Sequence, residues 1–187
     1  MNLIDIISLK NNLLILTKRT DSTMKVTARH QYTASVEDIY AFFASEKTVN
    51  DKYEALGSRK FRIKDLTTGP DTLTIDSRRE VPVGDEIPAM LKKFAGEWNR
   101  VRQRENWNKN SDGSYSCKLR IDIDGVPVKI NGDMTLQPEE NGCVNIVEIE
   151  INSSVPLVGK ALAEFVGQNT EQQMESEYQY IRSTSEK

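Results

Sequence analysis

The sequence predicts a single α+β domain in which a curved antiparallel sheet is followed by one long C-terminal helix. Two observations support this fold class. Between residues 25 and 151, apolar and polar residues alternate in segments separated by tight-turn signals, as in an antiparallel meander with one solvated face. From Pro156 to about Ser183, apolar residues instead recur at helical spacing. The 187 residues are enough to bury one core of useful size.

The first predicted elements are a strand and two short helices. Alternation across residues 25–32 places four side chains on one face of a half-buried strand: Val26, Ala28, His30 and Tyr32. Capping-box-like helix starts follow at residues 35–38 and 48–51. Gly57 stands where a helix C-cap is expected. We therefore expect two helices in tandem with a break near Lys47.

A meander of six strands is predicted next, which brings the sheet to about seven strands. Alternation marks strands near residues 61–64, 73–83, 97–107, 115–123, 126–130 and 147–151, with a short helix at 86–94. Asn, Asp and Gly tolerate the positive φ that primed hairpin turns require. Three dipeptides of this kind lie between strands: Asp112-Gly113, Asp124-Gly125 and Asn141-Gly142. Asn131-Gly132 interrupts a strand without changing its polarity, and we expect a bulge there that bends the sheet.

The last helix has a polar centre within its apolar stripe. Amide and hydroxyl residues stand where a uniformly core-facing helix would be apolar: Asn169, Thr170, Gln172 and Gln173. Gly159 and Gly167 each cost a helix about 1 kcal/mol relative to Ala. Their presence suggests that something approaches the helix closely there.

Residues 1–23 are expected to form an extension outside a domain that spans residues 24–187. Charged and amide residues interrupt its apolar clusters, so no stretch approaches the roughly 20 apolar residues that cross a bilayer. It also lacks the basic start and the cleavage pattern of a signal peptide. Two explanations stay open. Either translation starts at Met24 and the upstream residues are a start-site artefact, or they form an amphipathic helix that packs on the domain or touches a membrane surface.

Composition argues against several kinds of site and partner. One histidine and two cysteines cannot build a four-ligand Cys/His zinc site or a three-histidine catalytic site. The net charge of −3 argues against a duplex nucleic-acid partner. The sequence also lacks nucleotide-binding and hydrolase motifs. We expect no metal, no organic cofactor and no stable membrane insertion. Cys117 and Cys143 are expected to be reduced, core-facing thiols of a cytoplasmic protein.

The order of these elements resembles the START-like superfamily (SRPBCC, helix-grip fold), which includes lipid-transfer domains, polyketide cyclases and the major birch pollen allergen. Two segments resemble, more specifically, the bacterial family labelled domain of unknown function 2505. They are MKVTARHQY at residues 24–32 and SVPLVGK at residues 154–160, and the resemblance extends over about residues 24–182. It implies a curved sheet that grips the long helix around an apolar cavity, which in relatives holds a hydrophobic molecule.

On the geometry that this resemblance implies, seven side chains are candidates for lining the cavity: His30, Tyr32, Arg79, Trp98, Phe165, Asn169 and Gln173. No catalytic residue is predicted. For His30, the only histidine, two roles stay open: a neutral core imidazole, or a group that contacts a ligand or transfers a proton. Arg79 has the parity of the apolar residues of its strand, and a buried guanidinium must find a carboxylate, a carbonyl or an anionic ligand head group. An internal ion pair and a role as a cavity anchor therefore both stay open. Trp98 and Trp107 have opposite parities, so only one of them is expected to reach the cavity.

Three functional hypotheses follow. The first is non-covalent binding of a hydrophobic or amphipathic small molecule, lipid-like or polyketide-like, in an internal cavity. The second is a cyclase- or dehydratase-like enzyme in which His30 or Tyr32 moves a proton, although no motif places a carboxylate beside either residue. The third is a co-chaperone-like protein-interaction module, which an exposed apolar patch on the sheet would favour. The sequence carries no signal for an oligomeric state.

Overall fold

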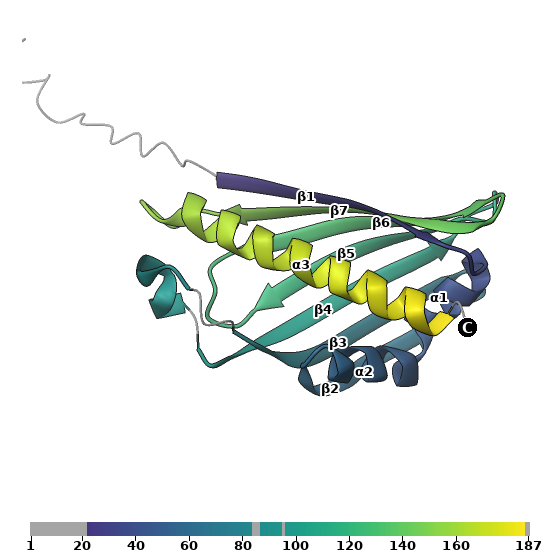
Figure 1. Cartoon of the computed structure of the whole chain (residues 1–187), viewed down its shortest axis with the longest axis horizontal. Helices are drawn as coiled ribbons and strands as arrows, with labels where there is room; N and C mark the ends of the chain where they lie inside the picture. The colour runs from purple at the N-terminus through teal and green to yellow at the C-terminus, as the bar shows by residue number, and fades with distance from the viewer. Residues whose placement is uncertain (1–21, 84–86, 95, 186–187) are drawn as a thin grey trace, which may run out of the picture.

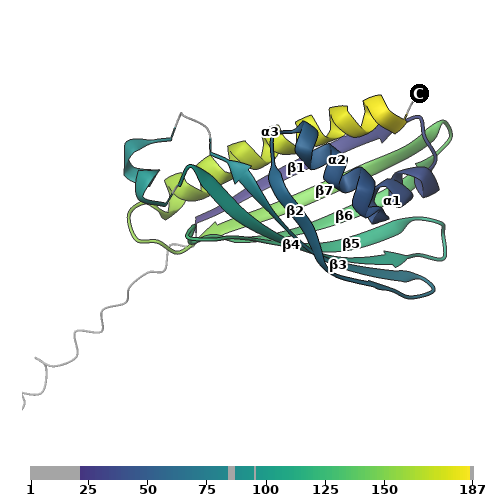
Figure 2. The ribbon, with the colours of Figure 1, turned by 90° about the horizontal axis from the view of Figure 1, so that it is seen from below.

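The computed structural model describes residues 22–83, 87–94 and 96–185, which form the predicted α+β domain (Figure 1). Seven antiparallel strands form one sheet in the order β1-β7-β6-β5-β4-β3-β2, and helix α3 lies along its concave face (Figure 2). The strands are β1 (Ser22–Tyr32), β2 (Arg59–Thr68), β3 (Thr72–Pro82), β4 (Trp98–Lys109), β5 (Tyr115–Ile123), β6 (Lys129–Glu139) and β7 (Gly142–Ser153). The helices are α1 (Val36–Ala44), α2 (Glu46–Ala55), the short 3-10 helix η1 (Ala89–Phe94) and α3 (Gly159–Ser185).

The strands form the expected meander. Strands β2 to β7 pair consecutively, and β1 pairs with β7 along its whole length, so the first and last strands of the sequence are neighbours. The glycines of the three predicted turns all have positive φ: Gly113 (83°), Gly125 (77°) and Gly142 (117°). The turn chemistry was therefore sufficient to place these connections.

The tandem helices are confirmed, but the second begins earlier than predicted. The Ser35 side chain accepts a hydrogen bond from the backbone N–H of Asp38, which caps α1. The second cap is Ser45, whose hydroxyl accepts from the N–H of Thr48, so Thr48 lies inside α2. Gly57 has a φ of 80° just after α2, as a C-terminal cap requires.

The predicted bulge at Asn131-Gly132 is wrong. Strand β6 keeps a continuous register with both β5 and β7 through these residues. Gly132 instead fits close packing, because a Cβ there would lie 3.1 Å from the carbonyl oxygen of Glu148 and 3.2 Å from Cγ1 of Ile149. The register shifts lie between β2 and β3, and Lys60 there has a φ of 55°. The strand irregularity that we predicted in β6 therefore lies in β2 instead.

Two apolar clusters fill opposite parts of the fold. The first joins α1 and the end of α3 to the sheet and includes Ile39, Leu73, Ile75, Trp107, Leu136 and Ile181. The second joins the beginning of α3 to β1 and the central strands and includes Val26, Leu119, Val147, Ile149, Leu162 and Val166. Cys117 and Cys143 are buried free thiols, as predicted. Burial raises the pKa of both, that of Cys143 to about 12, so neither is a thiolate near neutral pH.

Helix α3 packs mainly against β1 and β7, and its glycines allow the close approach that the sequence indicated. A Cβ at Gly167 would lie 2.5 Å from Cγ of Met24 on β1. A Cβ at Gly159 would lie 3.0 Å from the carbonyl oxygen of Ser153 on β7. The helix begins at Gly159, so Pro156 belongs to the preceding turn.

The predicted extension, residues 1–23, lies outside the described residues except for Ser22 and Thr23. These two residues are the first of β1 and pair with Ser153 and Asn152. Within the described ranges, no helix combines the length and apolarity that crossing a membrane would require.

The contact between Gly167 and Met24 predicts a non-additive pair of substitutions. Gly→Ala within a helix normally stabilises it by about 1 kcal/mol. Here the new methyl group overlaps Met24, so Gly167→Ala should instead lower the free energy of unfolding by about 1–3 kcal/mol. Urea denaturation of the purified protein measures this change.

The control is the same substitution in a Met24→Ala background, where the overlapping side chain is gone. There Gly167→Ala should be neutral or stabilising by up to about 1 kcal/mol. Equal destabilisation in both backgrounds would show that the contact does not hold α3 against β1.

Candidate functional site

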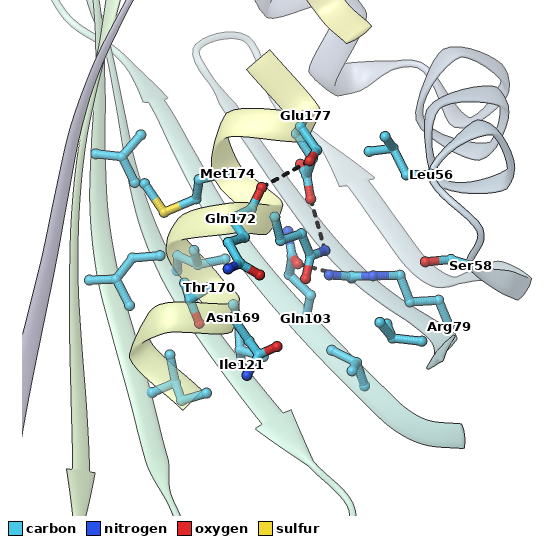
Figure 3. A pocket seen from close by; sticks show the side chains of 18 of the residues that line it. Leu56, Ser58, Arg79, Gln103, Ile121, Asn169, Thr170, Gln172, Met174 and Glu177 are labelled. Atoms are coloured by element: carbon cyan, nitrogen blue, oxygen red, sulfur yellow. Dashed lines mark hydrogen bonds between the residues drawn. The ribbon is translucent and has the colours of Figure 1, made fainter. Parts of the chain in front are cut away.

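A cavity of about 400 Å³ lies between the concave face of the sheet and α3 (Figure 3). Its volume is within the range of small-molecule pockets, about 300–1,000 Å³. Strands β4 to β7 supply an aliphatic wall that includes Val101, Leu119, Ile121, Ile130, Val147 and Ile149. Apolar side chains of α3, including Phe165, Val166 and Met174, face the same space.

The polar centre of α3 also lines this cavity. Asn169, Thr170, Gln173 and Glu177 contribute to it, and Figure 3 shows Asn169 and Glu177 on the helix opposite Gln103 and Arg79 of the sheet. The Asn169 amide donates to the carbonyl oxygen of Phe165, 2.8 Å away in its own helix. Polar side chains gain little from collapsing onto an aliphatic wall, which explains why this face of α3 is not packed against the sheet.

His30 and Tyr32 reach the cavity from β1 and contact Tyr178 of α3. The His30 and Tyr178 rings are stacked with their centroids 4.5 Å apart and their planes inclined by 4°. Tyr32 meets Tyr178 edge to face at 5.3 Å. Burial lowers the pKa of His30 below its ordinary value, and the charges of Glu175 and Glu177 offset only part of this effect. The imidazole is therefore neutral near pH 7.

Asn145 is directly opposite His30 in the ladder between β1 and β7. Both side chains are buried and line the cavity. Oδ1 of Asn145 has no hydrogen-bond partner among the described residues, and the His30 ring makes no hydrogen bond there either. The His30–Asn145 pair thus offers unused hydrogen-bonding groups on an otherwise apolar wall.

Arg79 is a second polar residue on the cavity side of the sheet that has a buried atom without a partner. Its side chain is buried, with 4% of the residue exposed. One guanidinium nitrogen, Nη1, donates to Oε1 of Gln103 at 3.0 Å, and Cζ lies 4.1 Å from the centre of the Tyr53 ring. Nε is buried without a partner, and Arg79 forms no ion pair within the described ranges. The internal ion pair that was one of its two predicted roles is therefore wrong.

A buried ion pair joins α2 to α3 beside Arg79. Nζ of Lys52 lies 2.6 Å from Oε2 of Glu177, and Gln173 donates to Oε1 of the same carboxylate at 3.0 Å. Burial acts to raise the pKa of Glu177, but the positive charges of Lys52 and Arg79 outweigh burial and hold this pKa below its ordinary value. Glu177 is therefore ionised, with both oxygens engaged.

Glu105 fixes the orientation of the Gln103 amide. Its Oε1 accepts from Nε2 of Gln103 at 2.7 Å, and its Oε2 accepts from Nε1 of Trp107 at 2.8 Å. With its amino group held by Glu105, Gln103 presents its carbonyl oxygen to Arg79. The guanidinium therefore meets a neutral acceptor at this position.

Six of the seven predicted candidates line the cavity: His30, Tyr32, Arg79, Phe165, Asn169 and Gln173. Trp98 is not among the lining residues, and that prediction is wrong. Its parity on β4 is opposite to that of buried Val101 and Trp107, and its ring instead packs against the guanidinium of Arg59 at 3.7 Å. Trp107 does not line the cavity either, because it is covered by Tyr40 and Phe43 of α1 in the core.

Sequence reasoning missed Gln103, Asn145, Glu177 and Lys52. A signal existed for two of them. Gln103 has the inward parity of Val101 on β4, and Asn145 has the inward parity of Val147 on β7. Lys52 and Glu177 had no such signal, because their contact joins residues 125 positions apart.

The chemistry that the cavity can perform follows from these groups. Across the part of the chain that the structure describes, no three His, Cys, Asp or Glu side chains are placed together to hold a metal ion. The cavity offers a neutral imidazole, amides and a guanidinium above an aliphatic wall. These groups suit hydrogen bonding to the polar part of a mainly apolar molecule.

Comparison with solved structures shows the helix-grip fold. The aromatase/cyclase Zhui from Streptomyces sp. R1128 is 12% identical, with a TM-score of 0.56 over 89% of this chain and 94% of that one. A STAR-related lipid transfer protein from Xanthomonas axonopodis is 12% identical, with a TM-score of 0.55 over 88% and 86%. Norcoclaurine synthase from Thalictrum flavum, solved with a transition-state analogue, is 13% identical, with a TM-score of 0.54 over 90% and 99%.

Among curated proteins, none matches the sequence significantly. A family model does match, and it spans residues 27–183, which includes every strand except the start of β1 and nearly all of α3. The seven-stranded sheet and the helix in its concave face give the chain the same helix-grip fold as these solved structures. Because the family model covers most of the chain, the chain belongs to the family described as protein of unknown function (DUF2505).

Proposed function

We propose that this protein binds one hydrophobic or amphipathic small molecule non-covalently in the cavity between α3 and the sheet. The observation that carries the proposal is a space of about 400 Å³ with an aliphatic wall and buried polar atoms that lack partners. The lipid-transfer and cyclase names of structural neighbours support the same class of ligand.

The aliphatic wall of the cavity favours binding of an apolar molecule. Side chains around an unfilled space lack contacts on one side, and a ligand that fills it restores them. Each Å² of apolar ligand surface removed from water contributes roughly 25 cal/mol. An aliphatic wall cannot orient a ligand, so the hydrogen-bonding groups at the His30–Asn145 pair would set its direction.

Proton transfer by His30 is a second candidate, and one observation favours it. The imidazole is neutral, faces the cavity and makes no hydrogen bond among the described residues, so it can accept a proton from a bound molecule. Ligand binding is preferred because no carboxylate of the described residues is hydrogen-bonded to His30 to orient it.

Filling the cavity should abolish binding of an apolar probe. Ile121 lines the cavity from β5, and Ile121→Phe adds a ring in that space. We expect the affinity for N-phenyl-1-naphthylamine, a neutral fluorescent probe, to fall at least tenfold, which is about 1.4 kcal/mol. Fluorescence titration measures this affinity, and native mass spectrometry should show one bound molecule on the wild-type protein.

Ile121→Leu is the matched control, because it conserves volume and should change the affinity less than threefold. Val147→Phe narrows the cavity from β7 and replaces Ile121→Phe if thermal unfolding shows that variant to be poorly folded. Undiminished probe binding by well-folded Phe variants would contradict the proposal.

The lowered pKa of His30 predicts a pH-dependent stability. The unfolded chain takes up a proton near the ordinary pKa of 6.5, whereas folded His30 resists protonation. This contribution to stability is therefore complete above pH 6.5 and is lost as the pH falls from 6.5 through the lower folded pKa. Between pH 7.5 and 5, the wild type should lose more unfolding free energy than His30→Gln, measured by urea denaturation. Parallel pH profiles of the two proteins would refute this effect.

A further inference from the structure

We propose that the ligand carries an anionic group, such as a carboxylate, and that Arg79 binds this group inside the cavity. The inference rests on the proposed function, because it names the chemical class of the molecule in the same cavity. Its structural basis is a buried cation whose hydrogen-bonding capacity the described residues leave largely unused.

Arg79 has more hydrogen-bond donors than the described residues accept. A guanidinium has five N–H donors and carries its charge at every physiological pH. The hydrogen bond from Nη1 to Gln103 is the one that the described residues provide, and the Nε donor is buried without an acceptor. Stacking on Tyr53 offsets part of the cost of burying the charge but accepts none of these N–H groups.

The neighbouring carboxylates are already committed to other donors. Both oxygens of Glu177 are engaged, one by Lys52 and one by Gln173. Both oxygens of Glu105 are engaged as well, one by Gln103 and one by Trp107. Neither carboxylate has an oxygen within 4.0 Å of a guanidinium nitrogen of Arg79, the distance that defines an ion pair. The protein thus neutralises Lys52 locally and leaves Arg79 with a neutral amide as its hydrogen-bond acceptor.

The position of Arg79 matches an amphipathic anion. Arg79 lines the cavity from β3, and the aliphatic wall extends from it across β4 to β7. A carboxylate can accept two parallel N–H bonds from one guanidinium. With its head group on Arg79, an anionic ligand would place its apolar part along the aliphatic wall.

Competition between two molecules of the same chain length tests this assignment. N-phenyl-1-naphthylamine reports occupancy, and decanoate or 1-decanol displaces it. We expect decanoate to compete at least tenfold better than 1-decanol in the wild type, although decanoate is the less apolar of the two. Arg79→Gln should remove this preference by weakening decanoate at least tenfold while leaving 1-decanol within threefold. Arg79→Lys keeps the charge and should retain part of the preference.

Arg78→Gln is the matched control, because Arg78 is the exposed neighbour on the same strand and should leave both affinities unchanged. Thermal unfolding shows whether each variant is folded. If Arg79→Gln is not folded, Arg79→Lys takes its place in the comparison of decanoate with 1-decanol. Equal competition by the two molecules in the wild type, or equal weakening of both by Arg79→Gln, would overturn the role of Arg79 while the proposed function stands. Absence of probe binding by the wild type would overturn both.

Discussion

The close contact between α3 and β1 is the constraint on which the rest of the structure depends. At Gly167 a Cβ would lie 2.5 Å from Cγ of Met24, so a larger residue would require Met24 to move, and α3 packs mainly against β1 and β7. The sheet curves away from that edge, so the same helix stands off from strands β3 to β5 (Figure 2). An offset helix over a curved sheet leaves a space that side chains do not fill. The cavity is thus a consequence of where α3 is held, and the glycine that weakens the helix locally is what permits this position.

The polar groups of α3 maintain that space. A helix with an apolar centre would gain by packing onto the aliphatic wall, whereas Gln173 and Glu177 would lose hydrogen bonds there. Glu177 has a second role, because its ion pair with Lys52 connects α3 to α2 across the open side of the sheet. A buried ion pair contributes little net stability, but removing one partner leaves an unpaired buried charge. The Lys52–Glu177 pair therefore ties α2 to α3 beside Arg79.

Sequence patterns predicted the elements of this fold better than their contacts. The period of two in a strand placed His30 on the inner face of β1, because alternation follows from backbone geometry alone. The same rule, applied to Val147 and its neighbours, would have found Asn145. Alternation cannot distinguish a residue that lines the cavity from one in the core, because both lie on the inner face of the sheet. Trp107, for example, is in the core because α1 covers it. The bulge expected at Gly132 failed for a related reason. A glycine in a strand signals either a bend or a close neighbour, and the sequence does not distinguish them.

Two of the polar places in the cavity, the His30–Asn145 pair and Arg79, differ in how they would select a ligand. The His30–Asn145 pair is neutral and can exchange hydrogen bonds with a water molecule as readily as with a hydroxyl or carbonyl group. Arg79 carries a charge that water in a small apolar cavity solvates poorly, so a neutral occupant would leave its N–H donors without a strong acceptor. The cavity would then favour an anionic over a neutral ligand both because the anion is attracted to Arg79 and because a neutral ligand leaves the guanidinium donors poorly accepted. A cavity whose apolar wall accepts many chain shapes can in this way remain selective for one kind of head group.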